Sequence, residues 1–312
     1  MASRIGEKVD LFQLEVFLAV ADTKSFSRAA QKLHRTQPAI SQAIRKLESE
    51  VGEALLQRAS RDGSLTDAGL LLRDYAEKLL NLRSEATSAL SELRQLQSGK
   101  LAIAANEFTS VYLLAVLEQF RRLCPMIKVA VQRSFASQIA QEVLNHKVEM
   151  GVLSFRPELD GLRSIVVYKD ELSFIVHPKH PLAQAEEVQI RQLGAESFVA
   201  HNVPSPYRAK VLEAFKRHRT PLNMEVELPT IEAIKRFVAM GNGVALVPGI
   251  CIEEELKRGD LVHIPVRELK FERKLRLVYR KGATLSHAAR AFLKIVETTA
   301  AQRQGRYVFE KE

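Results

Sequence analysis

The stretch from residue 25 to residue 47 constrains the fold of this chain more than any other. Its apolar residues recur at helical spacing in two short segments that meet near His34, which indicates two helices joined by a tight turn. Ser25 or Ser27 can cap the first helix and Thr36 the second, because a hydroxyl oxygen accepts an unpaired N–H of a first helical turn. Pro38 fits the first turn of the second helix, where N–H groups lack partners within the helix. The stretch therefore predicts a helix-turn-helix.

The predicted second helix has an apolar face and a polar face. Ile40, Ile44 and Leu47 form the apolar face. Amide, hydroxyl and guanidinium groups line the polar face: Gln37, Ser41 and Arg45, with Gln42 beside them. From residue 24 to residue 47 the charged residues are all basic: Lys24, Arg28, Lys32, Arg35, Arg45 and Lys46. A solvated face would usually mix acids with bases, so this pattern is typical of a helix that enters the DNA major groove.

Length and composition set wider limits. At 312 residues, with 46% hydrophobic and 27% charged residues, the chain is typical of globular proteins with two or three domains. Its formal net charge of +9 favours a polyanionic partner. Apolar runs are too short to span a membrane, and the N-terminal segment MASRIGEKVD lacks an apolar signal region. We therefore expect a cytoplasmic protein.

Two further elements flank the helix-turn-helix. Asp10 can cap a first helix that extends to Ala21, and its inward stripe consists of Leu11, Leu14, Leu18 and Ala21. After the second helix, the basic segment from residue 58 to residue 65 contains Gly63 and predicts a small β-wing. Arg58 and Arg61 on this wing can reach the DNA backbone or minor groove. Arg61 serves equally well as an ordinary surface charge.

A long helix is predicted from Thr66 to residue 97. Its apolar residues alternate spacings of four and three: Ala68, Leu72, Tyr75, Leu79, Leu82, Ala86, Ala89, Leu93 and Leu96. This heptad pattern favours a coiled coil, which buries its seam only against a partner helix. The alternative is an amphipathic helix packed on its own domain.

The remainder of the chain alternates predicted strands and helices. Three buried strands of a parallel sheet are expected near residues 101–105, 127–131 and 148–153, and a long strand at Ser164–Val176 leaves this first lobe. A second lobe follows, with strands near residues 197–200, 223–227 and 244–247, a helix from Ile250 to Arg258, and a return strand at 275–280. Two such lobes joined by crossing strands favour a ligand cleft between them.

Polar residues that follow successive strands are candidate ligand contacts. The N-termini of helices favour anions, so we expect a small anionic ligand to meet such residues at the cleft. The candidates in the first lobe are Thr109, Ser110, Ser134 and Ser137, and those in the second are His201, Asn202 and Thr230. Each serves equally well as an ordinary helix cap.

The segment SFSRAAQKLHRTQPAISQAIRKLESEVGEALLQRASRDGSLTDAG resembles the N-terminal domain of LysR-type transcriptional regulators. The segment VAMGNGVALVP, residues 238–248, is similar to a glycine-rich segment of the effector domain of that family. The resemblance covers nearly the whole chain. Two residues depart from the family pattern, because Leu56 replaces a usual phenylalanine and Arg35 occupies a turn position that is often apolar.

This resemblance implies a multidomain architecture with an α/β effector portion. It consists of an all-α winged helix-turn-helix head (residues 1–65), a long coiled-coil linker helix for dimerisation (66–97), a two-lobed periplasmic-binding-protein-like effector domain (98–300) and a polar, frayed tail (301–312). Lobe I would span about residues 98–167 and 267–300, and lobe II about 168–266.

The resemblance also implies a function. The chain would be a sequence-specific regulator that binds a pseudo-palindromic operator in double-stranded DNA and is switched by a small-molecule effector, without a cofactor. Family recognition-helix contacts carry over to Gln37, Pro38, Ser41 and Gln42, with Arg58 on the wing; the full candidate DNA-binding set adds Ser25, Arg35, Thr36, Arg45 and Arg61. A homodimer, a homotetramer built from two such dimers, and RNA polymerase contact in the case of an activator follow from the same resemblance.

Enzymatic chemistry finds little support in the sequence. The eight histidines show no HExxH or paired metal spacing, and neither GxSxG nor a phosphate-binding glycine loop occurs. Cys124 and Cys251 are interpreted as structural, with a redox pair like that of one subgroup of the family as the alternative. The competing function is a small-molecule-binding protein or enzyme in which the C-terminal lobes do the work.

Overall fold

The computed structural model describes residues 9–57, 64–94, 99–203 and 205–312. Its contacts divide the chain into two compact units, one with residues 1–94 and 145–147, the other with residues 95–144 and 148–312. We call the described residues 9–94 the head and residues 99–312 the effector domain. Within the described residues, no helix combines the length and apolar character needed to span a membrane.

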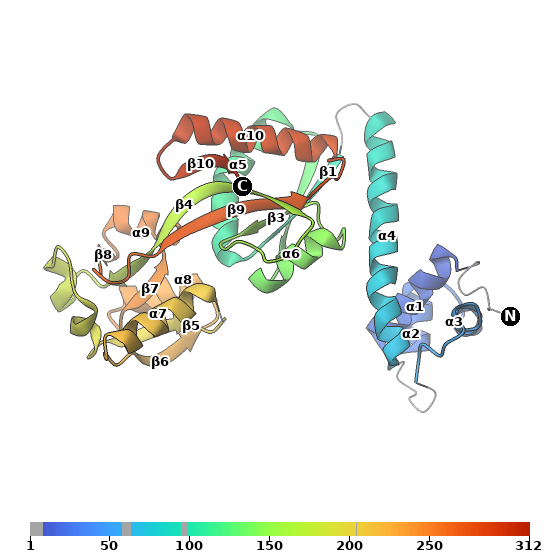
Figure 1. Cartoon of the computed structure of the whole chain (residues 1–312), viewed down its shortest axis with the longest axis horizontal. Coiled ribbons are helices and arrows are strands. Elements are labelled where there is room, and N and C mark those ends of the chain that lie inside the picture. Colours follow the sequence, from blue (N-terminus) through green and yellow to red (C-terminus); the bar gives the residue numbers. More distant parts are fainter. Residues whose placement is uncertain (1–8, 58–63, 95–98, 204) are drawn as a thin grey trace. The chain divides into compact units, whose positions relative to one another are not determined.

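The head contains the predicted helix-turn-helix between two further helices (Figure 1): α1 (Leu11–Thr23), α2 (Phe26–Lys32), α3 (Gln37–Val51) and α4 (Asp67–Arg94). Asp10 caps α1 as expected, since its carboxylate accepts the N–H of Gln13 at 2.8 Å. Ser25 caps α2. Thr36 occupies the N-cap of α3, but its hydroxyl makes no capping hydrogen bond. His34 takes a left-handed conformation (φ 53°) that turns the chain between α2 and α3.

Helix α1 is the centre of the head core. It packs against α2, α3 and α4, so residues on several of its sides are buried, including Val16, Phe17 and Val20. The single predicted stripe was therefore too narrow, and its first member, Leu11, is 37% exposed. On α3 the predicted apolar face is confirmed, because Ile40, Ile44 and Leu47 are all buried.

The predicted wing begins and ends with paired backbone. Leu56 and Leu65 form an antiparallel bridge, and the N–H of Gln57 donates to the carbonyl of Ser64 at 2.8 Å. Arg58 and Arg61 lie outside the described residues. Glu48 of α3 fixes the start of this segment, since its Oε1 accepts the N–H groups of Leu55 and Leu56.

The predicted heptad residues of α4 differ in burial along the helix. Ala68 and Leu72 pack against the core of the head, so the alternative of packing within one domain holds for the first turns. Farther along, Tyr75, Leu79 and Leu82 are 57%, 47% and 47% exposed. Ala76 is fully buried and Leu80 packs against the head core, so α4 contacts the head beyond its first turns while the predicted stripe is exposed at these three residues.

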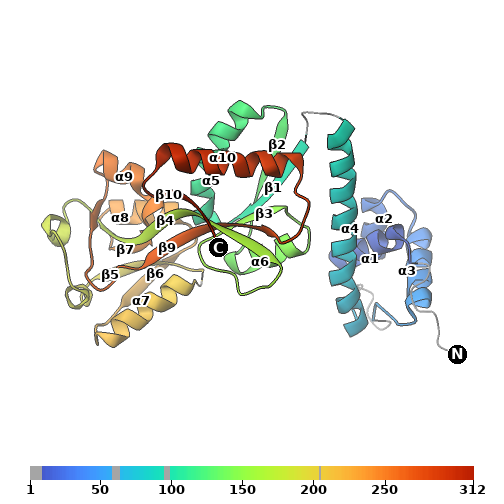
Figure 2. The ribbon, with the colours of Figure 1, turned by 45° about the horizontal axis from the view of Figure 1, so that its top comes forward.

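Lobe I of the effector domain is built on a mixed sheet with the strand order β10-β4-β9-β3-β1-β2 (Figure 2). The predicted parallel pairing is confirmed, because β1 (Gly99–Ala105) pairs in parallel with both β2 (Ile127–Arg133) and β3 (Met150–Leu153). The expected burial fails for β2, which lies at the sheet edge with Ile127 buried and Val131 exposed. The strands β9 (Glu272–Arg280), β4 (Leu162–Val176) and β10 (Tyr307–Lys311) run antiparallel to their neighbours. The helices of this lobe are α5 (Glu107–Leu123), α6 (Ala136–Leu144) and α10 (His287–Arg303).

Strand β4 continues into lobe II, where its second half pairs with β7 (Ala245–Pro248) and β8 (Val262–Ile264). Beside it, β5 (Ser197–His201) and β6 (Asn223–Leu228) form a parallel pair (Figure 2). The helices of lobe II are α7 (Pro206–Arg217), α8 (Ile231–Ala239) and α9 (Glu253–Arg258), with 3₁₀ turns η1 (Pro181–Gln184), η2 (Ile190–Leu193) and η3 (Gly249–Cys251).

Two predicted segments differ in the structure. The helix expected from Ile250 to Arg258 is split into η3 and α9. The tail expected to fray instead forms β10, which pairs with β4. Tyr307 of β10 packs against Tyr112 and Tyr168 with ring centroids 5.9 and 5.0 Å apart, and this apolar anchorage explains why a largely polar segment is ordered.

One apolar core is shared by the two lobes. Leu101 and Val116 of lobe I belong to the same buried cluster as Ile231, Val247 and Ile250 of lobe II. Helix α5 packs against η3 across the lobe boundary. The N-terminus of α5, which carries the first predicted ligand contacts, is therefore anchored beside lobe II.

Candidate DNA-binding face and lobe interface

The polar face of α3 is exposed as the sequence predicts. Gln37, Pro38, Gln42 and Arg45 are exposed, and Ser41 is partly exposed. The side-chain amide of Gln37 donates to the hydroxyl of Ser41 at 3.0 Å, across one turn of the helix. This bond orients the amide along the exposed face, where amide and hydroxyl groups suit the edges of DNA bases.

The other candidate DNA contacts of the head lie around this face. The hydroxyl of Ser25 accepts the N–H of Arg28 at 3.3 Å, so this side chain acts as the cap of α2. Thr36 and Arg35 are exposed at the turn, and the Arg35 guanidinium lies 5.7 Å above the ring of Phe12. Arg35 therefore packs against α1 while keeping its charge at the surface.

In lobe I, three of the four candidate ligand hydroxyls are hydrogen-bonded within the lobe. Thr109 is fully buried and forms a capping box with Asn106, in which the Asn106 N–H donates to Thr109 Oγ1 at 3.0 Å. Ser110 donates to the carbonyl of Glu107 at 2.8 Å, and Ser134 donates to a carboxylate oxygen of Glu142 at 2.5 Å. Ser137 is exposed on α6.

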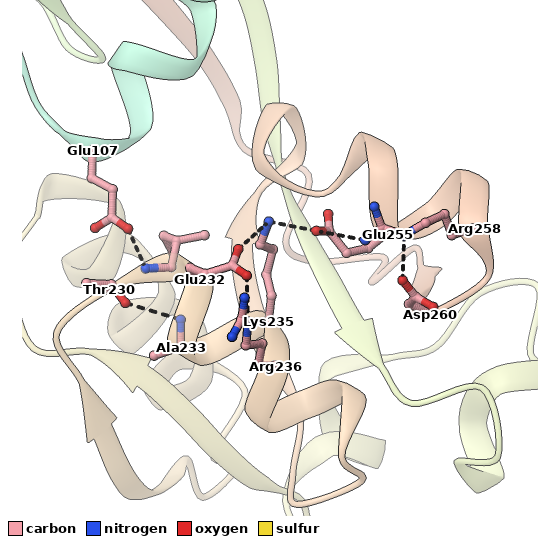
Figure 3. Close-up of polar contacts among 10 residues, drawn as sticks. Glu107, Thr230, Glu232, Ala233, Lys235, Arg236, Glu255, Arg258 and Asp260 are labelled. Atoms are coloured by element: carbon pink, nitrogen blue, oxygen red, sulfur yellow. Dashed lines mark hydrogen bonds and ion pairs between the residues drawn. The ribbon is translucent and has the colours of Figure 1, made fainter.

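In lobe II, two of the candidates lie at the contact with lobe I. The hydroxyl of Thr230 caps α8 by accepting the N–H of Ala233 at 3.2 Å (Figure 3). His201, at the end of β5, packs its ring edge-on against Phe108 of α5 with centroids 5.3 Å apart. Asn202 is exposed, and its N–H donates to the carbonyl of Leu228.

Glu107 connects these two candidates and was not selected from the sequence. It is the first residue of α5, yet its Oε1 accepts the N–H of Ile231 at the start of α8, at 2.8 Å (Figure 3). Its other oxygen lies 3.4 Å from Nε2 of His201. The sequence offers one signal for this role, an acid that directly follows the first strand and its capping asparagine. This signal is weak, because acids are common in the first turn of any helix.

A second set of contacts joins the lobes, and the sequence did not reveal it either. Asp170 of β4 and Arg273 of β9 form a buried ion pair with a distance of 2.6 Å between Oδ2 and a guanidinium nitrogen. Burial raises the pKa of Asp170 although Arg273 opposes this shift. The guanidinium stacks 4.8 Å from the ring of Tyr207, whose hydroxyl donates to the carbonyl of Ser154 in lobe I at 2.8 Å.

Helix α8 also carries a lysine that lies between two acids (Figure 3). Nζ of Lys235 lies 3.1 Å from Glu232 and 2.8 Å from Glu255. Burial works against the charge, but the hydrogen bonds with these carboxylates raise the pKa of Lys235. Its charge is therefore neutralised within lobe II, and α8 is tied to α9 at Glu255.

Cys251 is buried, and the residue types that bind metals form no cluster within the described residues. Burial raises the pKa of the Cys251 thiol to about 12, so at neutral pH it is protonated, the form with little nucleophilicity. Over the ranges that the structure describes, no three His, Cys, Asp or Glu side chains are grouped so as to hold a metal ion.

An exposed recognition helix together with a two-lobed α/β domain defines a class of protein, the ligand-responsive DNA-binding regulators. Residues 11–70 match the family model described as bacterial regulatory helix-turn-helix protein, lysR family, and residues 94–301 match the LysR substrate binding domain. The chain belongs to the LysR family of transcriptional regulators.

Similar proteins include two named probable RuBisCO transcriptional regulator. The one from Synechocystis sp. is 34% identical over 293 residues, which cover 92% of this chain and 85% of the relative. The one from Trichormus variabilis is 33% identical over 289 residues, which cover 90% of this chain and 86% of the relative.

Two solved structures support the fold. CbnR in complex with its target DNA superposes with a TM-score of 0.71 at 19% identity, over 94% of this chain and 100% of that chain. The regulatory domain of Synechocystis CcmR in complex with 2-PG superposes with a TM-score of 0.59 at 24% identity, over 66% of this chain and 98% of that chain.

Proposed function

We propose that this regulator recognises its operator through the polar face of α3 and responds to a small anionic effector bound between the two lobes. The observation that carries the DNA part is the Gln37–Ser41 pair, exposed on α3 and joined by a 3.0 Å hydrogen bond. Amide pairs read adenine edges, and guanidinium groups such as that of Arg45 bind guanine or phosphate. Pro38 and Gln42 complete the base-facing set, with Ser25, Arg35 and Thr36 beside it and Arg58 and Arg61 from the wing.

Gel-shift titrations test this assignment. Gln37→Ala is expected to relax sequence preference at one operator position by about 1–3 kcal/mol, because a base contact is lost. Arg58→Ala is expected to weaken binding to all sequences and to lower the slope of log affinity against log salt by about 0.9, the signature of a phosphate contact. Gln302→Ala, an amide on α10 of the effector domain, is the matched control. An unchanged sequence preference in Gln37→Ala would refute the recognition-helix assignment.

The effector part rests on the chemistry of the lobe interface. The first N–H groups of α8 favour an anion, and His201, Asn202 and Thr230 lie at or beside this end of lobe II. From lobe I, Ser134 and Ser137 are the proposed contacts, and Thr109 and Ser110 contribute by shaping the first turn of α5. The 2-PG complex of CcmR makes 2-PG a suitable first probe. A thermal shift of the whole chain that rises with 2-PG or another small anion would support binding.

Assembly and location complete the proposal. The exposed Tyr75, Leu79 and Leu82 support a homodimer through α4, which would place two heads on a pseudo-palindromic operator. Two dimers would form a tetramer through their effector domains, and RNA polymerase is a further partner if the protein activates transcription. We propose that it acts in the cytoplasm and without catalytic activity.

The names of the relatives suggest target genes. RuBisCO operons are the first targets to test, because the relatives that carry this name align with this chain over more than four-fifths of their own length. Footprinting upstream of such an operon in the source genome would decide between these and other targets. Turnover of small anions by the purified protein would instead favour the alternative in which the lobes form an enzyme.

A further inference from the structure

Glu107 makes an unusual contact for a residue at the start of a helix. The N-terminus of α5 lies in lobe I, yet the Glu107 carboxylate accepts the N–H of Ile231, which opens α8 in lobe II, at 2.8 Å. The backbone N–H groups of a first helical turn lack partners within their own helix. Thr230 satisfies the N–H of Ala233, so Glu107 supplies from the other lobe the partner that Ile231 needs (Figure 3).

His201 supplies a second donor to the same carboxylate. Its Nδ1 accepts the N–H of Val203 at 3.1 Å, so that nitrogen carries no proton. In a ring with an unprotonated Nδ1, the proton resides on Nε2, and Nε2 lies 3.4 Å from Oε2 of Glu107. Both atoms are shielded from solvent, and within the described residues neither forms a hydrogen bond, although they face each other across the lobe boundary.

The Ile231 N–H and the His201 Nε2–H form a pair of donors in lobe II, which we call the cradle. The Glu107 carboxylate is the anion that faces this cradle. The nearby acid on α8, Glu232, is directed to Arg236 and Lys235 instead. Lys235 is held by Glu232 and Glu255, so it neutralises carboxylates of lobe II (Figure 3). The two neutral donors of the cradle therefore face one carboxylate, which comes from the opposite lobe.

We propose that Glu107 is a built-in substitute for the anionic group of the effector: it holds lobe I against lobe II in the absence of ligand, and the carboxylate or phosphate of an effector must displace it. This inference rests on the proposed effector site, which it deepens. A latch of this kind sets the energy that an effector has to overcome, because a ligand shifts a conformational equilibrium only by its differential affinity for the two states.

Amide hydrogen exchange of the full chain without any ligand tests the latch itself. Glu107→Ala is expected to raise exchange at the Ile231 amide by about tenfold or more, because hydrogen bonds to charged acceptors contribute that much protection. Glu107→Gln, which retains an acceptor oxygen, should give a smaller increase. Glu232→Gln removes a charge from the same first turn and Tyr207→Phe removes another bond between lobes; neither should change exchange at Ile231. Wild-type exchange at Ile231 in Glu107→Ala would overturn the latch.

Inorganic phosphate and 2-PG then test the competition. Either anion should protect the Ile231 amide in Glu107→Ala at a concentration about tenfold lower than in the wild type, whereas Tyr207→Phe should respond like the wild type. Equal responses of Glu107→Ala and the wild type, including no protection in either, would overturn displacement by an anion. The ligand-free exchange result does not depend on an effector, and DNA titrations test the proposed regulator separately, so failure of the latch and failure of the proposed function are distinguishable.

Discussion

Gly69 shows how a single residue fixes the junction between the head core and α4. A Cβ atom built at this position would lie 2.1 Å from the carbonyl oxygen of Leu55 and 3.2 Å from the Leu65 side chain. The Leu55 carbonyl also accepts the N–H of Thr66 at 3.0 Å, so this backbone has little freedom to retreat. The start of α4 can approach the backbone of Leu55 this closely because residue 69 has no side chain.

Gly69→Ala is therefore expected to destabilise the head by about 1–3 kcal/mol, the usual effect of overpacking. Helix propensity alone predicts the opposite sign, since alanine stabilises a helix interior by about 1 kcal/mol relative to glycine. Urea unfolding followed by far-UV circular dichroism would measure the change. A variant that is more stable than the wild type would show that the contact with Leu55 relaxes without cost.

The two cysteines should differ sharply in reactivity. Burial, with the nearby charge of Asp170 as a smaller cause, raises the pKa of Cys251 to about 12, while Cys124 is partly exposed. Iodoacetamide at pH 7.5 should therefore label Cys124 and spare Cys251 until denaturant is added, because the thiolate is the nucleophile. Mass spectrometry of wild type and Cys124→Ser would measure this. Rapid labelling of Cys251 in the folded Cys124→Ser variant would revive the redox alternative.

At the residue scale, the sequence was informative about α3 and less so about the effector domain. The apolar and polar faces of α3 follow directly from periodicity, since one helix carries both. Thr109 and Glu107 show the limit: both follow β1, but Thr109 turns inward to cap its own helix while Glu107 crosses to lobe II. That difference depends on how the lobes meet, which no local pattern contains.

At the element scale, helix α4 combines both interpretations of its heptad pattern. Ala68, Leu72, Ala76 and Leu80 contribute to the head core, whereas Tyr75, Leu79 and Leu82 of the predicted stripe are exposed and can face a partner. Strand β10 differs more from expectation, because a polar segment is ordered by Tyr307 and by pairing with β4. Periodicity predicts that an amphipathic element exists, whereas its partner is decided by tertiary contacts.

The exposed part of α4 carries a prediction about assembly. Leu79→Glu combined with Leu82→Glu should convert a dimer into monomers, because each carboxylate would be buried unpaired in an apolar seam. Leu212→Glu on α7 alters a leucine of similar exposure (42%) outside this stripe and serves as the control. Light scattering would measure the mass. A double variant that retains the mass of the wild type would refute the coiled coil.

At the scale of the whole molecule, regulation requires that the effector domain and the head share one equilibrium. The shared core connects the Glu107 contact at α8 to the crossing strands β4 and β9, so the proposed displacement of Glu107 by an anion would affect both lobes. Binding energy applied at both lobes favours one arrangement of the effector domain over another. Its influence on DNA then depends on α4, which connects the two units along the chain.

Thermodynamic reciprocity makes this coupling measurable in either direction. If 2-PG changes operator affinity by a given factor, the operator must change the affinity for 2-PG by the same factor, typically about 5–150-fold. Calorimetric titration of the full chain with 2-PG, alone and with a saturating operator duplex, would measure that factor, and a duplex of scrambled sequence controls for non-specific DNA. Glu107→Ala should bind 2-PG more tightly in both titrations, because the competing carboxylate is gone. Equal affinities of the wild type with and without operator, for an anion that alters transcription, would rule out an equilibrium coupling between the effector domain and the head.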